Sequence, residues 1–88
     1  MVKKVFQINN RLGLHARPAA LLVKTAGKFN SSIQFAKDGY VVNGKSIMGV
    51  MTLAAEPGSE IEVIIEGEDA EKAMAAIGEL IENNFYED

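Results

Sequence analysis

Residues 60–66, Glu-Ile-Glu-Val-Ile-Ile-Glu, are the stretch that most restricts how this chain can fold. Ile61, Val63 and Ile65 lie on one face of an extended segment, and Ile64 adds apolar character to the other face. A strand that is apolar on both faces is most stable between other strands, because an edge position would leave it exposed to water and to aggregation. We therefore predict a strand over residues 60–66 at the centre of a sheet.

Three other segments have the alternating apolar pattern or the turn signals of strands, namely residues 2–8, 32–36 and 40–42. The dipeptide Asp38-Gly39 between the last two predicts a tight hairpin turn. The loop over residues 9–13 separates the first strand from the first helix, and Glu56-Pro57-Gly58 interrupts the chain before the central strand.

Three segments have helical patterns: residues 16 to about 28, 47–53, and 70 to about 84. The first places Ala19, Leu22, Val23 and Ala26 on one face and has Gly27 as a plausible C-terminal end. Ser46 and Asp69 are the expected N-caps of the other two helices. The expected core stripe of the last helix is Ala70, Ala73, Met74, Ile77, Leu80 and Ile81, with Glu71, Lys72, Glu79 and Glu82 facing water.

The resulting order is strand–helix–strand–strand–helix–strand–helix, which is typical of an α+β fold. Inserting the last strand between the first two gives a split βαβ arrangement, an antiparallel sheet with all three helices on one face. The bare pattern leaves other strand orders open.

Eighty-eight residues, 48% of them hydrophobic, suit one small domain over residues 1–88 that folds without disulfides. The chain has no cysteine, which fits a reducing cytoplasm and excludes thiolate chemistry, and its single histidine excludes a multi-histidine zinc site. No signal-peptide pattern is present, and the apolar runs are too short to cross a bilayer. We expect a cytoplasmic monomer with no metal, no cofactor and no membrane insertion.

The net charge of −3 hides a strong asymmetry between the two halves of the chain. Residues 1–50 carry eight of the nine basic residues and one acid, Asp38, whereas residues 51–88 carry Lys72 alone against eleven acids. A basic half favours phosphoryl groups and acidic partner surfaces. Direct nucleic-acid binding is disfavoured, because the chain is acidic overall and lacks interleaved stacking aromatics.

His15, the only histidine, lies one residue before the expected start of the first helix. Pro18 suits the first turn of a helix, and the unpaired N–H groups of that turn, from Ala16 and Arg17 onward, point back toward His15. An anion on the imidazole would meet backbone donors, the helix dipole and the Arg17 guanidinium together. A phosphoryl group fits this description best.

A lone histidine at a helix start is commonly a surface residue or a cap. The neighbouring residues favour an anion-binding role for His15. Gly13 would permit a tight approach to the imidazole, Arg17 supplies a planar set of five hydrogen-bond donors, and Pro18 stiffens the turn. A cap requires none of these three.

Two motifs carry a family resemblance. Residues 12–19, Leu-Gly-Leu-His-Ala-Arg-Pro-Ala, resemble the active-site signature of HPr, the histidine-containing phosphocarrier of the bacterial phosphotransferase system. Residues 43–51, Asn-Gly-Lys-Ser-Ile-Met-Gly-Val-Met, resemble that family's regulatory-serine segment, at the family's spacing. The resemblance covers essentially the whole chain and implies an open-faced β-sandwich with the antiparallel strand order 1-4-2-3.

The resemblance also implies a function. His15 would accept a phosphoryl group on Nδ1 from phosphorylated enzyme I and pass it to an enzyme IIA domain during sugar uptake. Arg17 would neutralise the phosphoryl oxygens, and the Ala16–Pro18 region at the helix N-terminus would help to bind them. Such a protein is a carrier that its partner enzymes phosphorylate and dephosphorylate, and it is not itself an enzyme.

An apolar docking patch beside His15 is expected from Ala20, Leu21, Ile47, Met48 and Met51, with Lys24 and Lys45 at its rim. Core filling is the alternative for the methionines, although the family analogy places Met48 outward. Ser46 is an N-cap from its position, and the resemblance adds phosphorylation there by a serine kinase/phosphorylase. Such a modification would link the protein to a catabolite-control transcription regulator.

Three alternatives remain open at this point. The acidic tail over residues 84–88 resembles the nitrogen-related regulatory branch of the family, which has the same His15 relay but no role in sugar transport. A phosphatase with His15 as nucleophile is disfavoured, because no acidic residue within the motif could orient the ring. A pure binding module would need no histidine and arginine aligned on one helix end.

Overall fold

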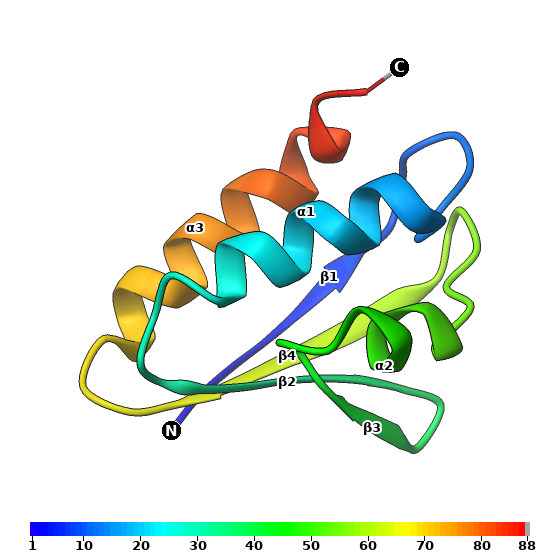
Figure 1. Cartoon of the computed structure of the whole chain (residues 1–88). Coiled ribbons are helices and arrows are strands. Elements are labelled where there is room, and N and C mark those ends of the chain that lie inside the picture. Colours follow the sequence, from blue (N-terminus) through cyan, green and yellow to red (C-terminus); the bar gives the residue numbers. More distant parts are fainter. Residues whose placement is uncertain (88) are drawn as a thin grey trace.

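The computed structural model describes residues 1–87, which form a four-stranded sheet covered on one side by three helices (Figure 1). The strands are β1 (Val2–Gln7), β2 (Ser32–Lys37), β3 (Tyr40–Asn43) and β4 (Glu60–Glu66). The helices are α1 (Ala16–Ala26), α2 (Ile47–Thr52) and α3 (Ala70–Glu82), followed by a short turn of 3-10 helix, η1 (Asn84–Tyr86). The α+β class and the predicted order of elements are confirmed.

The sheet is antiparallel, with the order β1-β4-β2-β3. Strand β4 pairs with β1 from Val2↔Ile65 to Gln7↔Glu60 and with β2 from Ser32↔Glu66 to Ala36↔Glu62. The most apolar strand is therefore central, as its sequence predicts. Asp38 and Gly39 both have positive φ, 51° and 85°, which is the backbone that a tight hairpin between right-twisted strands requires.

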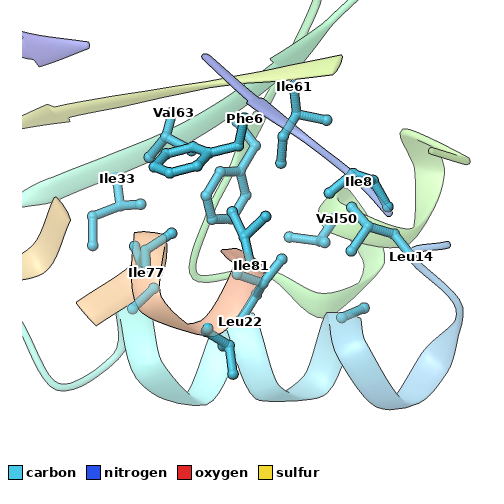
Figure 2. Close-up of a cluster of buried hydrophobic side chains, with 14 of the residues drawn as sticks. Phe6, Ile8, Leu14, Leu22, Ile33, Val50, Ile61, Val63, Ile77 and Ile81 are labelled. Atoms are coloured by element: carbon cyan, nitrogen blue, oxygen red, sulfur yellow. The ribbon is translucent and has the colours of Figure 1, made fainter. Parts of the chain in front are cut away.

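The core lies between the sheet and the helices (Figure 2). Strand β4 contributes Ile61, Val63 and Ile65, all fully buried, and β2 contributes Ile33 and Phe35. All six residues of the expected α3 stripe are buried, and the four charged residues expected to face water are exposed. One continuous apolar layer therefore joins the sheet to the helices.

Helix α1 differs slightly from the prediction. It ends at Ala26 instead of continuing to residue 28, and Gly27 forms its C-cap. Ala19, Leu22 and Ala26 are fully buried, but Val23 is only partly buried because it lies at the edge of the packed face. The core stripe of α1 is therefore narrower than its sequence suggests.

Asp69 directly precedes α3, at the position that the sequence predicts. Asp69 occupies the N-cap position, but its carboxylate makes no capping hydrogen bond. It accepts hydrogen bonds instead from the backbone N–H groups of Asn30 and Ser31, at 2.9 and 3.0 Å, and from the Ser31 hydroxyl. Asp69 therefore ties the start of α3 to the loop that precedes β2.

The C-terminal segment contacts the residue before α1, since the Glu87 Oε1 lies 3.1 Å from the His15 Nε2. Helix α3 ends at Glu82, earlier than predicted, and Asn84, Phe85 and Tyr86 all have left-handed φ between 53° and 57°. Left-handed backbone costs roughly 1–2 kcal/mol per non-glycine residue. Burial of the Phe85 side chain, worth roughly 1.5–3 kcal/mol, offsets part of this cost. The reversal carries Glu87 to the loop that bears His15.

Candidate functional site at the start of helix α1

The loop before α1 is fixed to a distant part of the chain. The Leu14 N–H donates to the Ala55 carbonyl at 2.9 Å, and the Leu14 side chain is buried. Gly13 has φ of +68°, and a Cβ there would overlap the Ala55 carbonyl oxygen. One close approach that Gly13 permits is therefore to the backbone of Ala55. The glycine acts on His15 indirectly, by fixing the loop.

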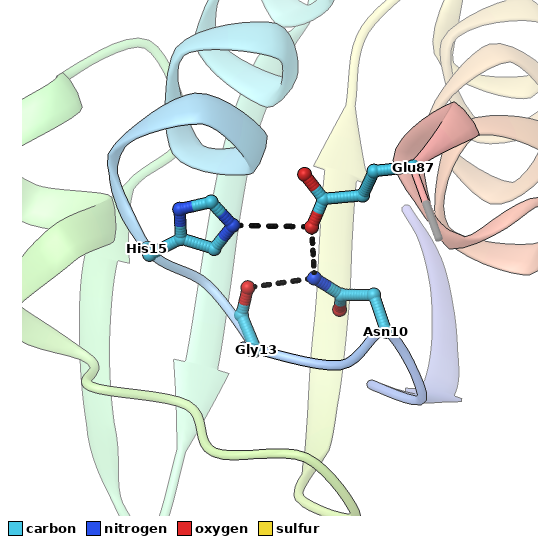
Figure 3. A network of polar contacts seen from close by, with 4 residues as sticks. All are labelled: Asn10, Gly13, His15 and Glu87. Atoms are coloured by element: carbon cyan, nitrogen blue, oxygen red, sulfur yellow. Dashed lines mark hydrogen bonds and ion pairs between the residues drawn. The ribbon is translucent and has the colours of Figure 1, made fainter.

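His15 is the N-cap residue of α1 and has extended backbone, yet its side chain does not cap the helix. The His15 Nε2 lies 3.1 Å from the Glu87 Oε1, and the side chains are 35% and 15% exposed, respectively (Figure 3). Figure 3 shows the second ring nitrogen, Nδ1, on the side of the ring away from Glu87. Within residues 1–87, Nδ1 has no hydrogen-bond partner. One ring nitrogen is thus occupied and the other is free.

Asn10 joins the loop to the C-terminal segment. Its side chain is buried, and its Nδ2 donates to the Gly13 carbonyl at 2.8 Å and to the Glu87 Oε1 at 2.7 Å. The hydrogen bond from Asn10 is the main cause that holds the pKa of Glu87 below its ordinary value, followed by the hydrogen bond and charge of His15 and the charge of Arg17. Glu87 is therefore an anion beside the imidazole at neutral pH.

The first turn of α1 contains the other predicted site residues. Pro18 is buried, whereas Ala16 and Arg17 are exposed. The first main-chain N–H of the turn that pairs is that of Ala19, which donates to the His15 carbonyl at 3.1 Å. A shallow depression of about 220 Å³ lies beside the ring and is lined by Arg11, Leu12, His15 and Glu87. The site therefore presents two arginines and a helix N-terminus around a half-exposed imidazole.

Helix α2 presents an apolar surface next to α1. We call the exposed set Leu12, Ala20, Ile47, Met48 and Met51 the apolar patch. Met48 is 71% exposed and Met51 41%, so the interpretation of these methionines as core filling is wrong and Val50 fills the core in their place. Leu21 is only half-exposed because it packs against the core, so it contributes less than expected. Lys24 and Lys45 are both exposed, and the Lys45 Nζ donates to the Phe29 carbonyl at 2.7 Å.

Ser46 caps α2 as predicted. Its hydroxyl oxygen accepts a hydrogen bond from the Gly49 N–H at 3.1 Å, and its backbone is extended. The side chain is partly exposed and lies directly before Ile47 and Met48 of the apolar patch. A modification of Ser46 would therefore change the charge at the edge of the apolar patch.

Comparisons with known proteins agree with this geometry. Residues 2–83 match the family model described as the PTS HPr component phosphorylation site. The phosphocarrier protein HPr of Treponema pallidum is 50% identical over all 88 residues and over the whole relative. A crystal structure of HPr from Thermoanaerobacter tengcongensis superposes with a TM-score of 0.96 at 48% identity, covering 100% of this chain and 99% of that one.

The chain belongs to the HPr family. Membership makes it a phosphocarrier-type protein of the phosphotransferase system. The family also contains HPr-like proteins named Crh. The Crh of Halalkalibacterium halodurans is 50% identical over 82 residues, covering 93% of this chain and 98% of the relative.

The HPr-type site contains two residues that sequence reasoning missed. Glu87 is 72 positions from His15, and no motif links them, so only the reversal at residues 84–86 brings them together. Asn10 has the sequence context of an ordinary loop residue, and nothing in the sequence indicates that its side chain is buried and that its Nδ2 donates to Gly13 and Glu87. The motif itself has no acidic residue, but Glu87 contacts the ring from outside the motif, so the absence of an acid in the motif no longer argues against a phosphatase.

Other kinds of site find less support in the described part of the chain. Within residues 1–87, no group of three or more His, Cys, Asp or Glu side chains could hold a metal ion. None of the helices in that range is both long and apolar enough to cross a membrane.

Proposed function

We propose that the protein carries a phosphoryl group on Nδ1 of His15, received from phosphorylated enzyme I and passed to enzyme IIA domains for sugar uptake. The observation that carries this proposal is the half-exposed imidazole at the N-terminus of α1, with Nε2 hydrogen-bonded and Nδ1 free. The family membership supports the same role. A protein of this kind is a substrate of its partner enzymes and works in the cytoplasm as a monomer.

The chemistry that we propose requires little from the carrier itself. The Nδ1 lone pair attacks phosphorus while the N–P bond to the donor histidine breaks, and the electron pair of that bond returns to the donor nitrogen. Phosphoryl transfer depends mainly on positioning and on charge stabilisation. Arg17 and the free N–H groups of Ala16 and Arg17 would face the phosphoryl oxygens, with a dipole contribution of about 0.3–1 kcal/mol. Partner enzymes would supply the remaining stabilisation.

The apolar patch would receive these partners. Its Leu12 lines the same depression as His15, and it contains two flexible methionines, which adapt to differently shaped surfaces. Lys24 would add a positive charge at the rim that matches acidic partners. Ser46, which lies at the edge of the apolar patch, would be the site at which a serine kinase/phosphorylase regulates docking and recruits a catabolite-control transcription regulator.

The nitrogen-related regulatory branch is the second candidate, because the acidic tail that resembles this branch is part of the site through Glu87. The two candidates share the His15 relay and differ in the enzyme IIA domain that they serve. Transfer from the phosphorylated protein to a sugar-branch IIA and to a nitrogen-branch IIA, measured side by side, separates them by relative rate.

The relay is tested with enzyme I and radiolabelled phosphoenolpyruvate. The wild type should acquire and retain an acid-labile label, and His15→Ala should acquire none while its circular dichroism spectrum and melting temperature stay close to wild type. Label that enters and is released as inorganic phosphate would identify a phosphatase instead. A wild type that never acquires label would identify a binding module, and label retained by His15→Ala would exclude His15 as the acceptor.

A further inference from the structure

The Glu87 carboxylate holds one specific edge of the His15 ring. Its Oε1 lies 3.1 Å from Nε2, and the Glu87 side chain is 15% exposed. A neutral imidazole carries one proton, and the nitrogen that bears it must be a donor. Since a carboxylate is an acceptor only, the contact places this proton on Nε2. Nδ1 then has a lone pair and no proton.

The position of Glu87 is itself determined by a buried side chain. The Asn10 Nδ2 uses one hydrogen for the Gly13 carbonyl and the other for the Glu87 Oε1. Turning the amide around would place Oδ1 against two oxygen acceptors, so the donor orientation is the only one that fits. Asn10 is 1% exposed, which leaves it little freedom to move. The loop that carries His15 and the carboxylate that contacts it therefore share one anchor.

The C-terminal segment reaches this point through a fixed path. The Phe85 side chain is 1% exposed and belongs to the core, and its left-handed backbone sets the direction of the two residues that follow. The Tyr86 N–H donates to the Asn83 carbonyl at 2.9 Å, and the Glu87 N–H donates to the Asn84 carbonyl at 3.1 Å. Glu87 thus approaches the site from a turn with two internal hydrogen bonds and a buried anchor.

We infer that Glu87 is a positioning residue for phosphoryl transfer, which holds His15 in the Nε2–H tautomer so that Nδ1 is the nucleophile. This inference rests on the proposed function for its role in the reaction, although the tautomer itself is a property of the free protein. When Nδ1 forms its bond to phosphorus, Nε2 keeps its proton and the ring gains a positive charge. That charge develops next to the Glu87 carboxylate, which stabilises it.

Two substitutions separate the effects of Glu87. Glu87→Ala removes both the acceptor and the charge, whereas Glu87→Gln retains a carbonyl oxygen that can accept from Nε2 and loses only the charge. The matched control is Glu82→Gln, which removes the same charge from an exposed residue at the end of α3. All variants are made in the full chain.

The first measurement is the tautomer of His15 by long-range ¹H–¹⁵N NMR correlation at a pH where the ring is neutral. The wild type, Glu87→Gln and Glu82→Gln should show the Nε2–H form, and Glu87→Ala should show a mixture with a substantial Nδ1–H population. A wild-type tautomer ratio in Glu87→Ala would overturn the inference. This result does not depend on phosphoryl transfer and is informative even if the proposed function fails.

The second measurement is enzyme I-dependent phosphorylation, with kcat and KM separated. Glu87→Ala should lower kcat about fivefold, the effect of losing one hydrogen bond, while KM changes by less than about twofold. Glu87→Gln should recover only part of kcat, because it keeps an acceptor for Nε2 but loses the charge that stabilises the phosphorylated ring. Equal losses in Glu87→Ala and Glu82→Gln, or a change in KM alone, would overturn the positioning role. If the wild type acquires no label on His15, the proposed function fails and the tautomer result stands alone.

Discussion

Gly13 lies directly against the carbonyl oxygen of Ala55, with no room for a side chain between them. The same carbonyl accepts the hydrogen bond from the Leu14 N–H at 2.9 Å. The loop before His15 is therefore held by the segment that follows α2, which places His15 and the apolar patch in one fixed relationship. This relationship makes Gly13 a structural requirement of the site.

Gly13→Ala should lower the free energy of unfolding by at least about 2 kcal/mol, because it combines left-handed strain with a backbone overlap. Gly39→Ala is the matched control: Gly39 has φ of +85°, but a Cβ there would meet nothing within 4 Å. It should cost about 1 kcal/mol, the strain alone. Denaturant unfolding measures both variants, and equal losses would show that the contact with Ala55 is unimportant.

Asp69 makes the stability of the fold depend on pH. Hydrogen bonds from the Ser31 hydroxyl and the Asn30 backbone hold the pKa of this carboxyl below its ordinary value of 3.8. A lowered pKa means that the folded state favours the carboxylate, so the contribution is fully present above pH 3.8 and is lost as the pH falls below it. Denaturant unfolding at a series of pH values should show this acid loss in the wild type.

Asp69→Asn should be less stable than the wild type at neutral pH and should lose stability less steeply below pH 4, since it has no carboxylate to protonate. Glu68→Gln is the control, because Glu68 is an exposed neighbour whose carboxylate makes no hydrogen bond or ion pair within residues 1–87. If the two variants have parallel stability profiles, Asp69 contributes nothing specific.

Met48→Asp should weaken binding to enzyme I about tenfold or more, because docking would bury an unpaired charge in the apolar patch. Since Met48 is 71% exposed, the change in the free energy of unfolding should stay within about 0.5 kcal/mol. Val41→Asp, on the sheet face that the helices leave open, introduces the same charge away from the apolar patch. Titration calorimetry that finds equal affinity for the two variants would rule out docking at α2.

Much of the fold follows from patterns that are local in sequence. Strand β4 was predicted with the observed bounds because its apolar residues alternate, and the cap at Ser46 follows from its position before an apolar run. Asp69 fits the same local rule, yet its carboxylate binds Asn30 and Ser31, which lie nearly forty residues away. A rule that uses only neighbouring residues cannot predict that the Asp69 carboxylate bonds to a distant loop and not to the N–H groups of its own helix.

The candidate site shows the same contrast between features set by neighbouring residues and features set by distant ones. The start of α1 at Ala16, with His15 directly before it, and the exposed Met48 were expected, because the relevant residues are neighbours in sequence or carry a family motif. Glu87 was not expected at the site, because the path of the chain from α3 to His15 depends on left-handed backbone at residues that are not glycine. Residue type gives no sign of that conformation, which the burial of Phe85 stabilises from the core.

Ser46 allows capping and charge to be tested separately. Ser46→Ala removes the acceptor for the Gly49 N–H and should cost about 1 kcal/mol of unfolding free energy. Ser46→Asp and Ser46→Asn both retain a good N-cap and have nearly the same shape, so both should stay close to wild-type stability. Only the aspartate adds a negative charge, which the N-terminus of α2 tolerates. Denaturant unfolding of the three variants establishes this baseline.

The enzyme I-dependent phosphorylation rate then reports the effect of charge on docking. Ser46→Asp should react more slowly than Ser46→Asn at low ionic strength, because a carboxylate at the edge of the apolar patch opposes an acidic partner and must be desolvated. The loss should appear mainly as a higher KM, since the chemistry at His15 is unchanged. Raising the salt concentration should shrink the difference as the charges are screened. Equal rates for the two variants at low salt would leave Ser46 with a structural role alone.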